Sequence, residues 1–247
     1  IVDDHVIEGN PADDRDWEQL AAYLQRRYPM AYNGATMGID AVSIDSGHHT
    51  QAVYNFVRMQ QHHMRIHAVK GSSEEGKPIK GTASPQEVTW KGQRWPHGLK
   101  LWVIGVDTAK DLLHGQLSIA QPGPGYVHFS QDLPREWYEQ LTAEQRIVTK
   151  AQGGESMRWV KRRPRNEKLD CRNYATHAAH MLGLHTMGDA AWQRLEALVQ
   201  PPPDLFSPRP IGVPAAAAGP AAPPPKPAAE AVPPPRATAA PAFARSW

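Results

Sequence analysis

The chain has 247 residues, and its 27 Lys and Arg stand against 25 Asp and Glu, so a formal charge of +2 excludes a polycation. Its single cysteine, Cys171, excludes disulfides within the chain, argues against a cysteine-based zinc site and fits a reducing cytoplasm. No apolar run approaches the ~20 residues that span a bilayer, and no signal peptide is visible.

Two features divide the chain before any element is assigned. From Pro201 onward 15 of 47 residues are proline and 14 are alanine, a composition that buries too little apolar surface to fold. We therefore expect one domain at 1–200 and a disordered Pro/Ala-rich tail at 201–247. The chain begins with Ile1 and lacks a G-x-x-x-x-G-K-[ST] motif, so we expect a fragment of a longer protein whose ATPase motor, if any, lies elsewhere.

The first half of the chain predicts strands alternating with helices. Apolar periodicity predicts a short strand at 1–10, a helix at 13–27, a buried strand at 39–44, a helix at 50–59 and a strand at 65–70. The polar stretch that follows, 71–98, could hold a hairpin or a loop. This alternation indicates an α/β fold.

The second half begins with the strongest strand signal, at 99–106. After it we expect a helix at 108–117 with Thr108 as a possible cap, a short strand within 121–129, a short helix at 134–141 and a strand pair within 149–163. A last helix is predicted at 166–184, with Asn166 at its N-cap and Gly183 as its stop.

Carboxylates from three places in the chain are the main chemical signal. Asp45 and Asp107 each follow a predicted strand, and ligands of open α/β sheets bind at the carboxyl ends of strands. Glu167 and Asp170 lie three residues apart in the first turn of the last helix, so they share a face. If that helix packs over the sheet, the oxygens converge. Clustered carboxylates need a counter-charge, and Mg²⁺ or Mn²⁺, as a pair of ions, could then support phosphodiester hydrolysis.

Each of these residues also has a simpler explanation. A single Asp after a strand is more often a helix cap or a turn residue, and Glu167 alone is more often a favourable charge at a helix N-terminus. The chemical interpretation therefore depends on their convergence. His48 and His49 follow the Asp45 turn directly and could touch either the metal ligands or the substrate.

A basic segment precedes the acidic helix. Between Lys150 and Arg172 there are eight Lys and Arg against three Asp and Glu. Four of the basic residues could bind DNA phosphates without reading sequence: Lys161, Arg162, Arg163 and Arg165. The alternative is a solvated surface that serves solubility.

Several motifs together resemble a known family. They are AVSIDSGHHTQAVYNFVR, HAVKG, LWVIGVDTAKDLLHGQL, PGPGYVHF and RNEKLDCRNYATHAAHMLG, in order from about Val6 to Leu184. This pattern resembles the nuclease region of the lambda-type family of tailed-phage terminase large subunits. The resemblance implies an RNase H-like (resolvase-type) mixed sheet flanked by helices, and an endonuclease that cuts concatemeric double-stranded viral DNA during packaging.

The resemblance also implies roles and partners. Asp45 of I-D-S-G matches the catalytic acid of the first strand, and Asp107 of V-D-T-x-K matches the middle metal ligand. Glu167 and Asp170 match the acidic helix motif, and either could be the third ligand. The expected partners are double-stranded DNA, an upstream ATPase domain of the full-length chain, the portal protein and a small terminase subunit. The expected location is the host cytoplasm, at the procapsid portal.

Two other classes compete with this interpretation. A restriction-type nuclease site built on Asp45 and Lys70 would need an acidic residue two positions before the lysine, where Ala68 stands. A degenerate RNase H-like module would only bind DNA or the portal, and intact acidic residues disfavour it. Usual RNase H folds place a hairpin after the first strand, whereas this sequence predicts a helix there, at 50–59.

Overall fold

A computed structural model describes residues 1–30, 35–151 and 154–199 of the chain. The predicted tail, 201–247, lies outside these residues, so the division at residue 200 stays a prediction. None of the helices in the described part has both the length and the hydrophobicity to span a bilayer.

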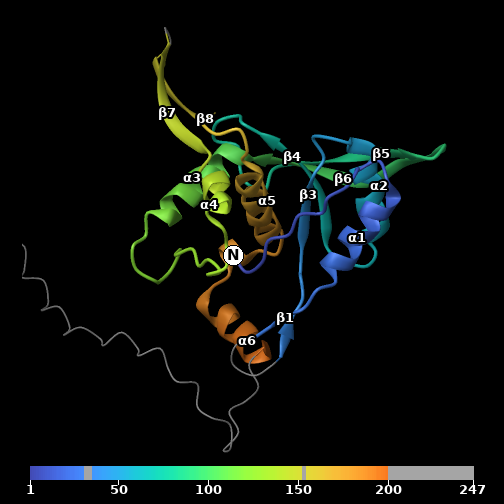
Figure 1. Ribbon diagram of the computed structural model, residues 1–247, viewed down its shortest axis with the longest axis horizontal. Helices are drawn as coiled ribbons and strands as arrows, with labels where there is room; N and C mark the ends of the chain where they lie inside the picture. Colours follow the sequence, from blue (N-terminus) through green and yellow to red (C-terminus); the bar gives the residue numbers. More distant parts are fainter. Residues whose placement is uncertain (31–34, 152–153, 200–247) are drawn as a thin grey trace, which may run out of the picture. The chain divides into compact units, whose positions relative to one another are not determined.

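A mixed four-stranded sheet forms the centre, in the order β3-β4-β6-β5 (Figure 1). The strands are β3 (Val42–Asp45), β4 (Ile66–Ser72), β5 (Ala83–Trp90) and β6 (Gln93–Gly105). β3, β4 and β6 run parallel, whereas β5 pairs antiparallel with β6. The sequence therefore predicted the α/β class and the β3 and β4 strands correctly. The stretch 71–98, for which the sequence allowed a hairpin or a loop, contains β5 and the first half of β6, which together form a hairpin.

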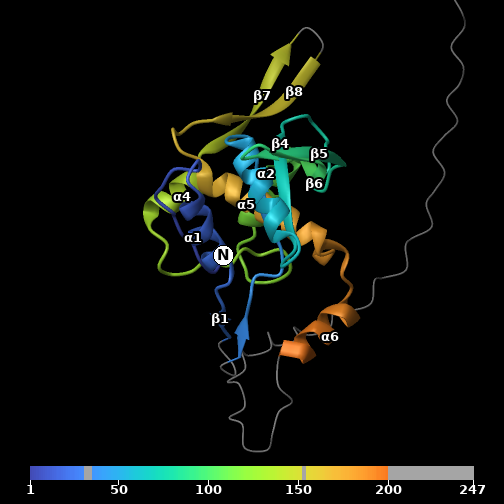
Figure 2. The same ribbon diagram turned by 90° about the vertical axis from the view of Figure 1, so that its right-hand side faces the viewer.

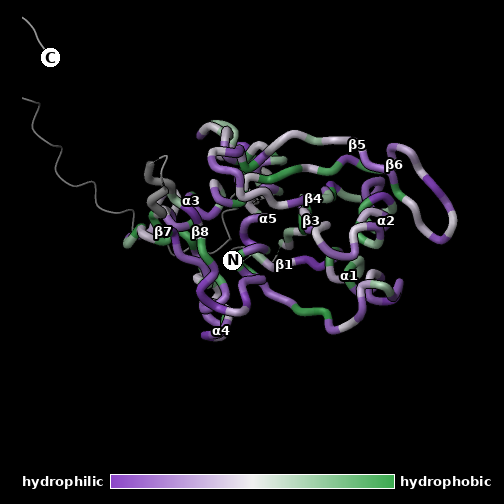
Figure 3. The backbone as a smooth tube through the Cα atoms, turned by 90° about the horizontal axis from the view of Figure 1, so that it is seen from above, coloured by the Kyte–Doolittle hydropathy of each residue, from purple (hydrophilic) through white to green (hydrophobic). Residues whose placement is uncertain are grey.

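One face of the sheet packs against two helices. Strand side chains alternate between faces, so Ile44, Ala68 and Leu101 point to the same side. There they pack against α2 (Thr50–Gln60), which contributes Val53, Phe56 and Val57, and against α1 (Asp14–Leu24). In Figure 3 the part of β6 that crosses the sheet is coloured hydrophobic, as a strand covered on both faces requires.

The other face packs against α5 (Glu167–Met181). Alternation turns Ser43, Asp45, His67, Val69, Trp102 and Ile104 to this side. Tyr174 of α5 packs against the cluster formed by Val69 and Ile104. α3 (Val106–Leu117) and α4 (Arg135–Leu141) pack beside α5. Asp45, at the end of β3, thus lies on the face of the sheet that α5 covers.

A close backbone contact fixes where β6 ends. A Cβ atom on Gly105 would lie 1.9 Å from the carbonyl oxygen of Lys77, so only glycine fits there. The Gly105 amide donates to the carbonyl of Pro78 at 3.0 Å, and the Thr108 hydroxyl donates to the carbonyl of Lys77 at 2.7 Å. Thr108 was predicted as a possible cap of its own helix. Instead, its hydroxyl attaches α3 to the segment that contains Lys77 and Pro78.

β7 and β8 form a two-stranded sheet that extends away from the other helices and strands as an arm (Figures 1 and 2). Its strands are β7 (Glu144–Ala151) and β8 (Gly154–Lys161), paired antiparallel from Glu144↔Lys161 onward. The predicted strand pair within 149–163 is confirmed, although β7 begins five residues earlier.

Three further differences from the predicted elements concern local structure. Residues 1–10 form no strand, because they run as irregular chain tied down by side chains such as Asp3, which accepts from Tyr23 and Tyr28. No strand forms within 121–129, where prolines and glycines set turns. The sequence prediction omitted four short elements: β1 (Tyr28–Pro29), β2 (Thr36–Met37), η1 (Leu184–Thr186) and α6 (Asp189–Val199).

Candidate active site

Acidic side chains from four segments meet where β3 and β6 end. Asp45 is the last residue of β3, and Asp107 lies in the first turn of α3, two residues after β6. Asp170 lies in the first turn of α5, and Glu144 is the first residue of β7. The charges of Asp45 and Glu144 act on Asp170, and that of Glu144 acts on Asp107, so the four carboxylates form one electrostatic cluster. We call these four residues the acidic cluster.

Lys110 of α3 lies inside the acidic cluster. Its Nζ atom is 2.7 Å from a carboxylate oxygen of Glu144 and 3.8 Å from Asp107. The side chains of Lys110 and Glu144 are each only 9% exposed, so this ion pair is shielded from water and strengthened by the low local dielectric. Lys110 thus supplies one fixed positive charge among the carboxylates.

Asn166 connects the segments of the acidic cluster. Its side-chain amide nitrogen donates to Glu144 at 2.9 Å and to Asp170 at 3.2 Å, while its oxygen accepts from Lys161 at 2.7 Å. Asn166 occupies the N-cap of α5, as predicted, but makes no side-chain capping bond. Its side chain instead connects both ends of the β7–β8 arm to α5.

The electrostatics of the acidic cluster favour an added positive charge. Burial raises the pKa of Asp170 to about 6; the Lys110 and Lys161 ammonium groups oppose the shift, and the carboxylates of Glu144 and Asp45 add to it. Burial also raises the pKa of Asp107, against Lys110 and together with Asp111 and Glu144. A buried oxygen of Asp107, Oδ1, has no hydrogen-bond partner within the described residues. Two of the carboxylates are therefore incompletely compensated by the protein's own groups.

Tyr174 of α5 contacts the acidic cluster through Asp45. Burial, then the charges of Asp45 and Asp170 and a hydrogen bond to Asp45, raise the pKa of its hydroxyl above the ordinary value. The phenol therefore stays protonated and donates to Asp45. A Cβ atom on Gly71 would lie 3.5 Å from the Tyr174 oxygen, so the end of β4 forms the wall behind it.

A buried histidine lies one turn further along α5. Nδ1 of His177 is 2.8 Å from the Ser43 hydroxyl, and its ring, which is 0% exposed, contacts the rings of His67 and Trp102. Burial, and then the nearby His67, lower the pKa of His177 to about 4. A neutral imidazole thus joins α5 to β3 two residues before Asp45.

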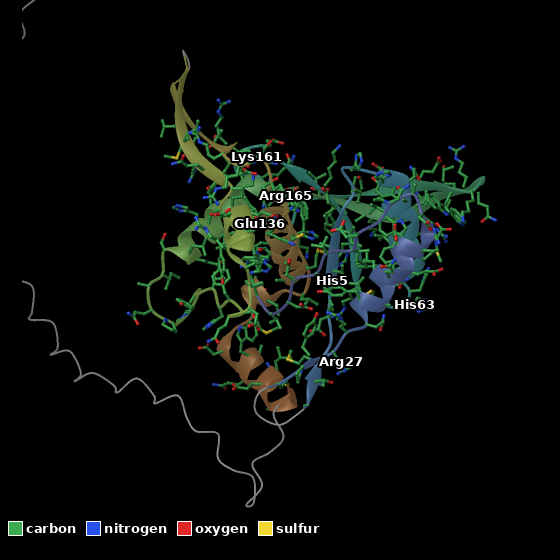
Figure 4. All side chains as sticks on the ribbon, in the orientation of Figure 1. His5, Arg27, His63, Glu136, Lys161 and Arg165 are labelled. Carbon is green, nitrogen blue, oxygen red and sulfur yellow. The ribbon has the colours of Figure 1, made fainter. Side chains whose placement is uncertain are left out.

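Glu167 does not join the acidic cluster. Its side chain is 55% exposed and pairs with Arg165 at 3.2 Å. Arg165 also pairs with Glu136 of α4 at 3.0 Å, and Figure 4 shows Lys161, Arg165 and Glu136 close to one another beside α4 and α5. Of the two candidates on the acidic helix, the structure brings only Asp170 to Asp45 and to Lys110 and Glu144, whose charges also act on Asp107.

The remaining predicted site residues lie around the acidic cluster rather than within it. His48 and His49 are exposed and contact each other edge to face, and His49 has a left-handed backbone at the start of α2. Arg162 and Arg163 are exposed, and their amides donate to the carbonyl of Ala143, next to Glu144. These arginines therefore lie at the base of the arm, and Nη1 of Arg163 donates to the carbonyl of Glu139 at 2.9 Å.

The chemistry of the acidic cluster fits a hard divalent cation. Carboxylate oxygens are the ligands that Mg²⁺ and Mn²⁺ prefer, and Oδ1 of Asp107, which lies 3.8 Å from Lys110, accepts no hydrogen bond from the described residues. As the side chains stand, however, no group of three or more His, Cys, Asp or Glu in residues 1–30, 35–151 and 154–199 is positioned to hold a metal. Lys110 and Asn166 lie between the carboxylates instead.

Sequence reasoning missed three members of this site. Glu144 and Asn166 act through tertiary contacts that no local pattern reveals, although Asn166 was recognised as a cap. Lys110 was visible as the lysine of V-D-T-x-K, one helical turn after Asp107, and that spacing could have identified it as a charge partner.

Comparisons with known proteins identify the family of the chain. Residues 1–192 match the family described as "Terminase large subunit gpA, endonuclease domain". The chain is 29% identical over 188 residues to the terminase large subunit of Escherichia phage lambda, covering 72% of this chain and 28% of that protein. It is 30% identical over 186 residues to that of Enterobacteria phage P21, covering 71% of this chain and 27% of the relative.

No solved structure matches the chain. Its fold is a mixed sheet flanked by helices. The chain spans less than a third of the length of these two relatives. The family match covers more than three quarters of the chain and includes every residue of the acidic cluster. The chain therefore belongs to the family of gpA-type endonuclease domains of phage terminase large subunits.

Proposed function

We propose that this chain is a divalent-metal-dependent endodeoxyribonuclease that cuts concatemeric double-stranded viral DNA during packaging. The observation that carries the proposal is that Asp45 and Asp170, from distant segments, interact directly, and that Asp107 shares Lys110 and Glu144 with Asp170 around incompletely compensated charge. The family supports the nuclease role, and the carboxylates supply the ligand chemistry that phosphodiester hydrolysis uses.

Asp45, Asp107 and Asp170 would hold Mg²⁺ or Mn²⁺, as two ions. When bound, the metal supplies a water of lowered pKa and stabilises charge on the leaving oxygen. Asp170 is a better candidate than Glu167, which is exposed and paired with Arg165. Tyr174 would orient the Asp45 carboxylate through its hydrogen bond.

The basic residues have separate tasks in this proposal. Lys110 keeps Glu144 in place and limits the negative charge of the acidic cluster, so a DNA phosphate can approach. Lys161, Arg162, Arg163 and Arg165 would bind phosphates beside the cut and position the backbone without reading bases. His48 and His49 are exposed after the Asp45 turn, so they would be available to the substrate.

The wider setting is also part of the proposal. In a full-length terminase, an upstream ATPase domain would move the DNA, and the portal protein and a small terminase subunit would be partners at the procapsid in the host cytoplasm. The sheet would be a variant of the RNase H-like (resolvase-type) fold. In this variant the hairpin, β5–β6, comes after two parallel strands rather than after the first.

A plasmid-cutting assay tests the proposal. The chain should convert supercoiled plasmid to nicked and linear forms with Mn²⁺ or Mg²⁺, and Asp45→Asn should lose this activity while keeping its thermal midpoint. Titration of the metal-free chain with Mn²⁺ by calorimetry adds a readout independent of cutting. Folded protein that binds no Mn²⁺ and never cuts would identify a module that only binds DNA or the portal, and would overturn the proposal.

A further inference from the structure

The β7–β8 arm begins inside the acidic cluster. Glu144, the first residue of β7, binds Lys110 and Asn166, and Lys161, the last residue of β8, binds the same asparagine. The amides of Arg162 and Arg163 donate to the carbonyl of Ala143 at 2.7 and 3.2 Å. Both ends of the arm are therefore fixed to the residues proposed to cut DNA.

A second attachment sets the direction of the arm. Asp111 of α3 accepts from the indole nitrogen of Trp159 at 3.0 Å and pairs with Arg146 at 3.2 Å. Arg146 and Trp159 are opposite each other in the register of β7 and β8. The Arg146–Trp159 pair, near the base of the arm, is thus held against α3 at Asp111, one helical turn after Asp107.

Beyond this attachment, the arm exposes apolar side chains. Val148 and Met157 are direct cross-strand partners, and they are 50% and 49% exposed. Arg158 follows Met157 on β8, so its exposed side chain points to the opposite face of the ribbon. An exposed apolar pair on one face and a positive charge on the other, on an arm attached to the acidic cluster, suggest a surface that a ligand covers.

We propose that the β7–β8 arm lies in the groove of the DNA duplex beside the cut, with Arg158 on a phosphate and Val148 and Met157 against the groove wall. The proposal deepens the nuclease function and rests on it. Residues 144–163 carry six Lys and Arg against two Asp and Glu, and Lys110 already neutralises one of those acids. A two-stranded β-ribbon fits the major groove, and the continuity of the arm with the acidic cluster favours DNA over a protein partner.

Equilibrium binding to a short DNA duplex, measured by fluorescence anisotropy with the full chain in EDTA, tests the proposal. Arg158→Gln should weaken binding about threefold or more and reduce the slope of log affinity against log salt by about one. The double variant Val148→Ser with Met157→Ser should weaken binding about threefold with no change in slope. The matched control is Arg94→Gln, on the other hairpin, where Arg94 pairs with Glu87; it should bind as wild type.

The outcomes separate the two proposals. Arm variants that bind as wild type, or an equal loss in Arg94→Gln, overturn the role of the arm. Plasmid cutting by Asp45→Asn at the wild-type rate overturns the nuclease site but leaves the binding comparison intact. Thermal midpoints within about 2 °C of wild type for all variants show that the exposed substitutions leave the fold unchanged.

Discussion

The two halves of α5 face the same sheet with different chemistry. The first half carries Asp170 and Tyr174 into the acidic cluster, where charges interact directly. The second half carries His177, which is fully buried, held neutral and bonded to Ser43. Because Ser43 and Asp45 are two residues apart on one face of β3, the neutral contact and the charged contact are adjacent.

This difference shows how one helix can be both anchored and reactive. The buried half gains its stability from packing and from a hydrogen bond that needs no counter-charge. The charged half retains excess negative charge, which costs stability and is the property that a metal site requires. Substitutions in the two halves should therefore have separable effects on activity and on stability.

The largest effect should be on DNA cutting, and it should distinguish the two acidic residues in the first turn of α5. Asp170→Asn should reduce Mn²⁺-dependent cutting by about a hundredfold or more, because an amide cannot replace a charged ligand. Glu167→Gln should stay within about threefold of wild type, since Glu167 is exposed. Initial rates on plasmid DNA provide the comparison, and a greater loss in Glu167→Gln would reverse the assignment.

The next effect should be on stability, at Lys110. Lys110→Met leaves Glu144 buried without its partner, which should lower the free energy of unfolding by about 3 kcal/mol. The double variant Lys110→Met with Glu144→Gln should recover part of that loss, because the buried Glu144 charge is removed while Asp107 and Asp170 still lack the Lys110 ammonium. Urea unfolding of the metal-free proteins measures both. Equal stabilities of the single and double variants would contradict the ion pair as the cause.

A smaller stability effect is expected from the buried half of α5. His177→Ala should lower the free energy of unfolding by about 2 kcal/mol, through the cavity and the lost bond to Ser43. Cutting by the folded fraction at low temperature should stay within about threefold of wild type. A hundredfold loss in a folded His177→Ala protein would show that the two halves are not separable.

The smallest effect is a pair of opposed pH dependences in metal-free protein. Asp170 has a pKa of about 6 in the fold against an ordinary value of 3.8, so its contribution makes stability fall as the pH rises from about 4 to 6. His177 has a pKa of about 4 against 6.5, so its contribution makes stability rise over about pH 4 to 6.5. The two slopes oppose each other in the wild type.

Each slope can be isolated by one substitution. In Asp170→Asn the thermal midpoint should rise more steeply than wild type between pH 4 and 6, because only the histidine contribution remains of the pair. In His177→Ala the rise should be shallower. Parallel pH profiles for all three proteins would contradict the shifted pKa values.

Much of the sheet could be predicted from the sequence because its strands and helices have strong local patterns. The apolar runs of β3 and β4 and the helical stripe of α2 identified a strand-helix-strand unit. The apolar half of β6 was also evident. The other half was left undecided because Gln93 to Gly98 is polar and pairs with β5 beyond the core. The strand expected at 1–10 was wrong because short apolar alternation occurs in irregular chain too.

The candidate site could be predicted only in part. Asp45 and Asp107 were found because a strand end is a recognisable position, and the acidic helix was found by its motif. The choice between Glu167 and Asp170 depends on the rotation of α5 against the sheet, which spacing alone does not fix. Glu144 was invisible because nothing in its own segment marks it; the partner that gives it meaning, Lys110, lies 34 residues earlier.

The backbone contact at Gly105 limits how this site can be redesigned. Any side chain at this position would displace the carbonyl of Lys77, which also anchors Thr108, and would therefore shift Asp107. A mutational library aimed at altering metal preference could vary the carboxylates themselves, but randomising position 105 should return glycine alone among active clones. The location of Asp107, the proposed middle ligand, is thus set by an absent side chain rather than by a present one.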